Sequence, residues 1–108
     1  HQFVKIGKYS MIGGMSGVEK NILPYCLYIG IRTGIKGLNL VGLKRKNKSN
    51  EEIKLISSFL NYIFDNKNPI NLNITRMDQK FHNVMEIKDM IKFIDQSNKR
   101  GIATLINE

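Results

Sequence analysis

The chain of 108 residues has a single cysteine and no long uninterrupted run of apolar residues. One cysteine, Cys26, excludes a disulfide framework within the chain and a cysteine-based metal cluster, and it suits a reducing compartment. We expect its thiol to act as a small buried hydrophobic group. No apolar stretch approaches the length needed to span a bilayer. The sequence therefore predicts a soluble protein without a transmembrane segment.

The chain is poor in acidic residues, with 9 Asp and Glu against 17 Lys and Arg, which gives a formal net charge of +8. Such a charge is typical of nucleic-acid-binding domains. Aromatic residues do not alternate with the basic ones, however, so the sequence offers no platform on which bases could stack. An acidic protein partner fits a basic surface equally well.

A repeat of six residues occupies positions 6–23. Its three hexads open with Ile6, Ile12 and Val18. One aliphatic residue per six is typical of parallel β-helices, in which three hexads close one triangular coil. We expect these three side chains to point into the coil, and stacked coils to bury them. Small residues should allow the backbone to turn, namely Gly7, Ser10, Gly13 and Ser16. The alternative is a chance run of short β-strands.

The repeat also bears on the extent of the protein. A single coil leaves two open ends of unpaired backbone, and repeat architectures need about three units before they bury a continuous core. The chain begins at His1, without an initiator methionine, and runs into the first hexad without a polar cap. We therefore expect earlier coils before His1 and interpret the chain as the C-terminal part of a longer β-helical protein.

The periodicity changes after Pro24 and Tyr25, which we interpret as the end of the hexads. Gly30, Gly34 and Gly37 then punctuate a predicted loop that leads away from the coil. The predicted fold is accordingly mixed β and α. Residues 1–33 would form the last coils of the β-helix, and residues 34–108 a C-terminal helical domain.

Four helices are predicted in the second part. A short one carries Leu40, Val41 and Leu43 on its apolar side and ends in Lys44–Lys46. A second opens at Ser49, whose hydroxyl and the carboxylate of Glu52 form a capping box. Apolar residues at helical spacing follow it and stop before Asp65–Pro69: Ile53, Ile56, Phe59, Leu60, Ile63 and Phe64.

The last two predicted helices have weaker patterns. The third would carry Ile74, Met77, Phe81, Val84 and Met85, although residues 70–74 alternate and would also suit a strand. The fourth stops before Gly101, and its apolar residues are Ile87, Met90, Ile91 and Ile94.

Three segments together carry a family resemblance. Residues 12–18 read IGGMSGV, Pro24 and Tyr25 follow, and residues 37–45 read GLNLVGLKR. This combination resembles the C-terminal part of UDP-N-acetylglucosamine O-acyltransferases, bacterial enzymes that catalyse the first step of lipid A synthesis. The resemblance covers residues 1 to about 60. Hexads alone would equally fit sister acyltransferases, acetyltransferases and succinyltransferases, but the Asn-x-x-Gly-Leu-Lys-Arg helix distinguishes this family.

The resemblance implies a fold and a reaction. Members are cytoplasmic homotrimers of left-handed parallel β-helices with C-terminal helical domains, and their active sites lie between subunits. A (3R)-3-hydroxyacyl chain moves from acyl carrier protein to the 3-hydroxyl of UDP-N-acetylglucosamine. A histidine general base and a backbone amide at the oxyanion perform this without metal or cofactor. In the family that base lies on an earlier coil, so neither His1 nor His82 is assigned its role, and the chain alone is expected to be inactive.

The resemblance also assigns residues to the acyl side of the site. His1 and Gln2 match a segment that lines the cleft near the sugar nucleotide and the acyl chain. Without the family they would be read as a polar pair on the coil surface. Gly14 matches the floor of the acyl groove, where residue size limits chain length. On its own it would be read as a turn glycine.

On the nucleotide side, Asn39 matches a residue that contacts the nucleotide, and Arg45 one that reaches its phosphates. The planar donor fork of arginine suits phosphate. Lys46 stands where the family often has a second arginine, and it keeps the charge without the bidentate geometry. The alternative for residues 44–46 is a solvated helix end whose charges complement the helix dipole.

Other positions depart from the family pattern. Val41 stands where some members have an acidic residue, Arg32 stands where some have a histidine, and residues 47–48 replace the usual pair of a glycine and an aromatic residue. Two further function classes stay open beside the acyltransferase. One is a sister hexapeptide transferase that acts on another sugar or amine, and the other is a basic, non-enzymatic module whose binding to nucleic acid would be sensitive to salt.

Overall fold

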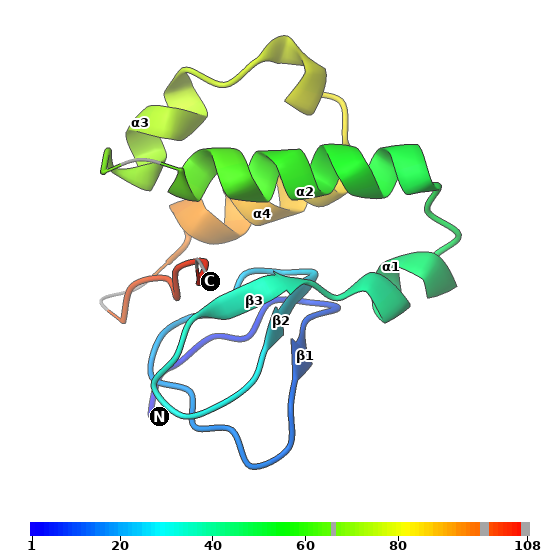
Figure 1. The fold of residues 1–108 in the computed structure, drawn as a ribbon. Helices are drawn as coiled ribbons and strands as arrows, with labels where there is room; N and C mark the ends of the chain where they lie inside the picture. The colour runs from blue at the N-terminus through cyan, green and yellow to red at the C-terminus, as the bar shows by residue number, and fades with distance from the viewer. Residues whose placement is uncertain (66, 98–99, 107–108) are drawn as a thin grey trace.

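The computed structural model describes residues 1–65, 67–97 and 100–106. The N-terminal part winds into a coil, and the helices lie together above it in the orientation of Figure 1. The elements follow one another as β1 (Met11–Ile12), β2 (Cys26–Tyr28), β3 (Ile35–Leu38), α1 (Leu40–Arg45), α2 (Asn50–Phe64), α3 (Ile70–Thr75), the 3-10 helix η1 (Gln79–Phe81) and α4 (Met85–Asp95).

Successive windings of the coil stack in parallel, as the hexads predict. β1 pairs in parallel with β2, with Ile12 opposite Tyr28, and an isolated parallel bridge joins Ile6 to Ile22. Both pairs are 16 positions apart (28 − 12 and 22 − 6). The expectation that three full hexads make one turn is therefore wrong by two residues at these pairs.

The six-residue period is visible in the backbone at unexpected positions. Phe3, Tyr9 and Met15 have φ angles of 66°, 57° and 60°, so left-handed residues recur every six positions. The prediction that small residues allow these turns is correct in part, because the N–H of Ser10 donates to the Gly7 carbonyl at 3.3 Å and closes the turn around Tyr9, but the left-handed positions themselves hold large residues. Gly7 and Gly13 lie instead where the next winding comes close. A Cβ atom on Gly7 would lie 2.4 Å from the backbone nitrogen of Pro24, and one on Gly13 would lie 2.8 Å from Ile29 Cγ1.

The aliphatic positions of the hexads differ in burial. Ile12 and Val18 pack, partly buried, against the core. Ile6 is 48% exposed, so it is not buried as predicted. Further along the winding, the thiol of Cys26 is fully buried, as expected, and that burial raises its pKa to about 12.

Parallel pairing continues beyond Pro24 and Tyr25, the point predicted for the end of the hexads. β2 follows Pro24 and Tyr25 directly and still pairs in parallel with β1. The predicted loop at residues 30–37 contains most of β3, which pairs antiparallel with β2. The C-terminal segment then returns to the coil through parallel bridges of Ile102 with Asn21 and of Leu105 with Ile35. Figure 1 shows this red segment beside the coil.

α2 forms as the sequence predicts. Ser49 and Glu52 make the capping box, and Asp65 is the C-cap. One face of the helix is buried, with Ile53, Ile56, Phe59, Leu60 and Ile63. The short helix α1 is also observed, but its predicted apolar side is not buried as a whole. Leu43 is 1% exposed, whereas Leu40 and Val41 are 49% and 52% exposed.

The predicted third helix is wrong in its limits. Residues 70–75 form α3, which also excludes the alternative strand, and η1 follows after a break. Asp78 explains the break, because its carboxylate accepts a hydrogen bond from the backbone N–H of Lys80 and starts η1. α4 confirms the predicted fourth helix and buries Ile87, Met90 and Ile94.

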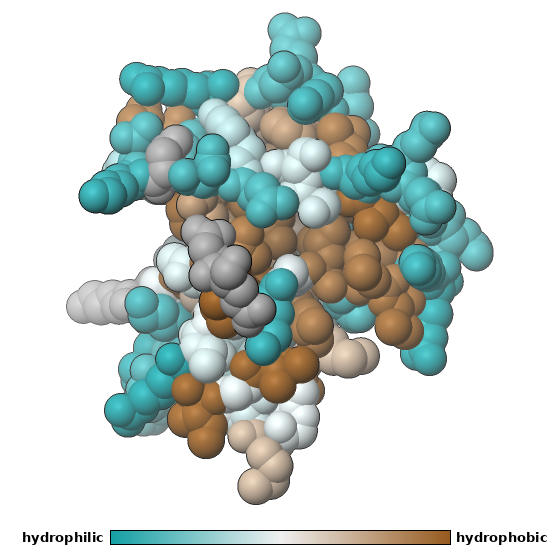
Figure 2. Space-filling view, viewed as in Figure 1, coloured by the Kyte–Doolittle hydropathy of each residue, from teal (hydrophilic) through white to brown (hydrophobic). Residues whose placement is uncertain are grey.

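Hydrophobic side chains occupy the middle of the face shown in Figure 2, while hydrophilic ones project around the helices. The core runs from the coil into the helices, from Ile22 and Tyr28 to Phe59 and Met90. No helix in the described ranges has the length and hydrophobicity that crossing a membrane requires.

Candidate ligand-binding groove

The N-terminal end of α1 is fixed to the coil by Asn39. Its Oδ1 accepts a hydrogen bond from the backbone N–H of Gly42 at 3.1 Å, and its Nδ2 donates to the carbonyl of Tyr9 at 2.8 Å. Asn39 is 8% exposed. A helix of six residues has little stability of its own. Its position therefore depends on such contacts with its surroundings.

The C-terminal end of α1 is fixed by Lys46, the C-cap residue. Its Nζ lies 3.2 Å from Glu86 Oε2 on α4. The same ammonium group lies 4.6 Å from the ring centroid of Tyr9 and 4.9 Å from that of Tyr25. These two rings stack with centroids 5.6 Å apart. Lys46 thus joins α1 to α4 through one ion pair and to the coil through two cation–π contacts.

Glu86 is the buried centre of this arrangement, with a side chain only 1% exposed. Its Oε2 also lies 3.1 Å from Nζ of Lys48. Burial alone would raise the pKa of the Glu86 carboxyl. Hydrogen bonds from its own backbone, from Lys48 and from Lys46 outweigh that effect and hold the pKa below its usual value. Glu86 is therefore ionised at neutral pH and balances two lysines.

A second ionic contact of α4 lies beside the first. Asp89 Oδ2 is 3.1 Å from Nζ of Lys8 and accepts a hydrogen bond from the Tyr25 hydroxyl. Burial and the neighbouring Asp89 raise the pKa of Tyr25, so that its hydroxyl stays protonated. Burial alone would raise the pKa of Asp89. The hydrogen bonds from Tyr25 and Lys8 lower it by more, so that the pKa lies below its usual value. α4 is thereby attached to the coil.

A groove of about 370 Å³ runs along α1, lined by Tyr9, Met11, Asn39, Val41, Gly42, Arg45 and Lys46. The Arg45 side chain is exposed, and no ion pair involves it among the described residues. Its guanidinium is thus available for a ligand. The amide nitrogen of Asn39 has two N–H groups, of which the described contacts use one. The groove can therefore accept an anionic ligand with an aromatic or apolar part beside Tyr9.

The predicted site residues fall into two groups. Asn39, Arg45 and Lys46 all line the groove, whereas His1, Gln2 and Gly14 do not. His1 and Gln2 are exposed on the first winding, where the Gln2 carbonyl accepts a hydrogen bond from Arg100 Nε at 3.0 Å. Gly14 is exposed too, and a Cβ atom there would meet nothing within 4 Å. His82, to which no role was assigned, is the exposed C-cap of η1.

Two contributors to the groove were not predicted from the sequence. Tyr9 was passed over because a coil of 18 residues would not have placed its ring against Tyr25, whereas the observed winding does. Glu86 lies 40 positions from Lys46, and no periodicity links the two. The solvated-end interpretation of residues 44–46 is correct only in part. Lys44 and Arg45 are exposed, but the Lys46 side chain is 26% exposed and paired.

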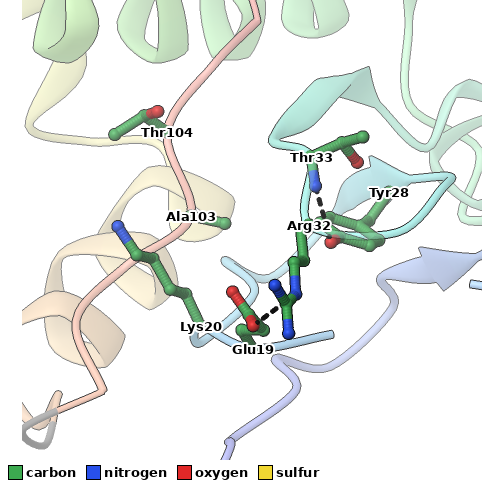
Figure 3. Close-up of a pocket in the computed structure, with 7 residues that line it drawn as sticks. All are labelled: Glu19, Lys20, Tyr28, Arg32, Thr33, Ala103 and Thr104. Carbon is green, nitrogen blue, oxygen red and sulfur yellow. Dashed lines mark hydrogen bonds and ion pairs between the residues drawn. The ribbon is translucent and has the colours of Figure 1, made fainter. Parts of the chain in front are cut away.

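A second cavity of about 210 Å³ lies between the coil and the C-terminal segment. Figure 3 shows Arg32 turned toward Glu19, with Nε and Oε1 at 2.9 Å. The Tyr28 hydroxyl accepts from the Thr33 N–H at 3.2 Å and donates to the Gly17 carbonyl at 2.8 Å. These polar groups already have partners, so the cavity offers less to a ligand than the groove. Within the described residues no group of three His, Cys, Asp or Glu side chains could hold a metal ion.

A known family matches most of the chain. The model described as "Udp N-acetylglucosamine O-acyltransferase; Domain 2" matches residues 21–103. That range contains α1, the groove-lining Asn39, Arg45 and Lys46, and Glu86.

Curated relatives cover nearly the whole chain. The acyl-[acyl-carrier-protein]--UDP-N-acetylglucosamine O-acyltransferase of Sulfurovum sp. is 37% identical over 102 residues, which are 94% of this chain and 38% of the relative. The enzyme of the same name from Bartonella henselae is 27% identical over 104 residues, 96% of this chain and 38% of the relative. The chain thus spans well under half the length of these relatives.

Solved structures agree with these relatives. UDP-N-acetylglucosamine acyltransferase from Campylobacter jejuni superposes with a TM-score of 0.78 at 32% identity, over 98% of this chain and 40% of that one. The Arabidopsis enzyme of that name superposes with a TM-score of 0.82 at 27% identity, over 99% and 39% respectively. The coil and the helices are both included in these matches.

Proposed function

Since the chain belongs to the UDP-N-acetylglucosamine O-acyltransferase family, we propose that the whole protein transfers an acyl group from acyl carrier protein to UDP-N-acetylglucosamine. The acyl group would be a (3R)-3-hydroxyacyl chain and the acceptor the 3-hydroxyl of the sugar. This reaction would be the first step of lipid A synthesis. The described residues would supply the nucleotide end of the acceptor site.

The groove along α1 is the observation that carries this proposal. Arg45 presents a guanidinium without an ion-pair partner among the described residues, and its fork of donors matches the oxygens of a diphosphate. Lys46 adds a second positive charge from the edge of the same groove, although Glu86 already holds it. The remaining N–H of Asn39 would contact the nucleotide. The exposed ring of Tyr9 would cover an apolar face of it.

The catalytic steps belong to parts of the protein outside these residues. We propose that further windings continue the coil as a left-handed parallel β-helix, and that three subunits associate in the cytoplasm with active sites between them. A histidine on one of those windings would remove the proton from the sugar hydroxyl while a backbone amide stabilises the oxyanion. No cofactor or metal is required for these steps. His1 and Gln2 would line the cleft, and Gly14 would form the floor of the acyl groove.

The proposed reaction can be tested by supplying the whole protein with 3-hydroxyacyl-acyl carrier protein and several acceptors. We expect acylation of UDP-N-acetylglucosamine with release of free acyl carrier protein. The 108-residue chain under the same conditions should give no product. Acylation of another sugar or of an amine, with UDP-N-acetylglucosamine left unchanged, would favour a sister transferase and contradict the proposal.

The role of Gly14 can be tested separately with donors of different length. Gly14→Met should shift the preference in kcat/KM toward donors several carbons shorter, because a floor moved inward removes about 0.8 kcal/mol for each methylene no longer buried. The open space around Gly14 leaves the coil undisturbed by a side chain. Gly14→Ala serves as the matched control, with a much smaller shift. Identical donor profiles for wild type and Gly14→Met would leave Gly14 as a turn residue.

A further inference from the structure

The two carboxylates of α4 that contact the rest of the molecule face different targets. Asp89 binds Lys8 and Tyr25 on the coil. Glu86 binds Lys46 and Lys48, which lie just after α1. Among these contacts of the described residues, only that of Glu86 joins a groove residue directly, and Glu86 itself does not line the groove. It stands behind Lys46, away from the space a ligand would occupy.

The backbone of Lys46 closes the last turn of α1. Its N–H lies 3.2 Å from the Gly42 carbonyl and 3.1 Å from the Leu43 carbonyl. Arg45 precedes it in the same turn. A displacement of Lys46 would therefore change the turn that carries the Arg45 guanidinium. The ion pair with Glu86 would act on the orientation of Arg45 through this turn.

Besides the ion pair with Glu86, this end of α1 is held by the cation–π contacts of Lys46 with Tyr9 and Tyr25. Leu43 is the one residue of α1 that is buried, and the Asn39 contacts act on the opposite end of the helix. Removing the charge of Glu86 would leave Lys46 without an ion-pair partner among the described residues, whereas Lys48 would keep its ion pair with Glu52 at 3.2 Å. Breaking a buried ion pair on one side leaves an uncompensated charge, which moves toward water.

We propose that Glu86 is a positioning residue for the groove, which holds Lys46 from behind and thereby sets the last turn of α1 and the guanidinium of Arg45. The inference rests on the proposed function for the identity of the ligand. It extends that function to a residue of the helical domain that touches no substrate. Glu86→Gln should loosen the turn, and the acceptor should bind more weakly while the acyl-transfer step itself keeps its rate.

The matched control is Asp89→Asn, which makes the same chemical change on the same helix at a carboxylate that pairs with Lys8 and reaches Lys46 only through the Tyr25 ring. In the whole protein, calorimetry with UDP-N-acetylglucosamine should show a Kd about tenfold higher for Glu86→Gln and less than twofold higher for Asp89→Asn. KM for the acceptor should follow Kd, with kcat nearly constant. Glu86→Asp should recover part of the affinity. Equal weakening by both substitutions would reduce Glu86 to a general stabiliser of the fold and overturn the proposal.

A double-mutant cycle tests the route through Lys46. In a Lys46→Met background, Glu86→Gln should add less than a twofold change in Kd, because the contact through which it acts is already gone. A further tenfold loss in that background would contradict the positioning role.

A measurement without ligand separates this inference from the proposed function. Glu86→Gln should accelerate hydrogen exchange at the backbone N–H of Lys46, and Asp89→Asn should leave that rate unchanged. If wild type fails to bind UDP-N-acetylglucosamine, the proposed function fails, and the exchange rates alone decide whether Glu86 holds α1. An unchanged rate in Glu86→Gln would overturn the inference even if the wild type binds the ligand.

Discussion

The packing within the coil and the packing within the helices depend on different features of their residues. In the helices, large side chains decide the packing, as in α2, where Ile56 and Phe59 are fully buried on one face. The coil also buries large side chains such as Ile22 and Tyr28, but its packing depends in addition on missing side chains, since Gly7 lies where any Cβ atom would collide with Pro24. The strands of the coil are only two to four residues long. The helical part should therefore be sensitive mainly to the removal of side chains, and the coil to their addition as well.

The largest expected effect is the loss of a large side chain from α2. Phe59 is fully buried, and its ring meets that of Phe81 edge-on at 5.5 Å. Phe59→Ala should lower the free energy of unfolding by about 4 kcal/mol, because it removes apolar contacts and leaves a cavity. Urea unfolding followed by circular dichroism would measure this. Ser58→Ala, on the exposed side of the same helix, should change the free energy by less than about 0.5 kcal/mol.

A smaller loss is expected when one methyl group is added to the coil. Gly7→Ala would place a Cβ atom 2.4 Å from the backbone nitrogen of Pro24. Backbone atoms cannot rotate away, so the free energy of unfolding should fall by about 3 kcal/mol. Gly14→Ala is the matched control, because a Cβ atom there meets nothing within 4 Å. If the two variants were equally stable, the coil would not depend on close approach between windings.

Acid should weaken the junction between the two parts. The pKa values of Glu86 and Asp89 lie below their usual values in the folded chain. Their contribution is therefore fully present above those usual values and is lost as the pH falls through the lower folded-state pKa values. Unfolding free energies measured between pH 7 and pH 3 should fall less steeply for the double variant Glu86→Gln/Asp89→Asn. A slope identical to that of wild type would show that these carboxylates do not link the two parts.

The smallest effect concerns the start of α2. The Ser49 hydroxyl accepts from the Glu52 N–H at 3.1 Å, and the Glu52 carboxylate accepts from the Ser49 N–H at 3.3 Å. Ser49→Ala should cost about 1 kcal/mol, the usual worth of an N-cap. Ser49→Asp should restore most of this, since a carboxylate caps as well. An unchanged free energy of unfolding in Ser49→Ala would mean that packing alone holds the first turn.

Local signals in the sequence were sufficient for the best-predicted elements. α2 was recognisable because its capping box and its buried face lie within one short stretch of sequence. α4 was recognisable from its apolar spacing in the same way. The third helix was misjudged because Met77 and Phe81 continue a helical spacing across Asp78, whose carboxylate caps a new turn. Periodicity does not register this competition between a side chain and the backbone.

The groove could be predicted from the sequence only in part, because contacts between distant segments form it. The hexads indicated a coil, but a winding of 16 residues rather than 18 changes which residues stack, and this places Tyr9 on Tyr25. Asn39, Arg45 and Lys46 were identified through the family resemblance, and the structure brings them to one groove. The contact of Lys46 with Glu86 joins two helices that no local pattern relates. Only the folded chain reveals it.

The central claim is that the groove along α1 binds the phosphates of a sugar nucleotide through Arg45. Its most direct test compares Arg45→Ala with Lys44→Ala in the whole protein, since both remove one positive charge from the same exposed helix end but only Arg45 lines the groove. Calorimetry should show that Arg45→Ala weakens the binding of UDP-N-acetylglucosamine by about 1.5–3 kcal/mol, the scale of a lost charge-assisted hydrogen bond, while Lys44→Ala leaves Kd nearly unchanged. Equal Kd values for wild type and Arg45→Ala, or equal weakening by both substitutions, would contradict the claim.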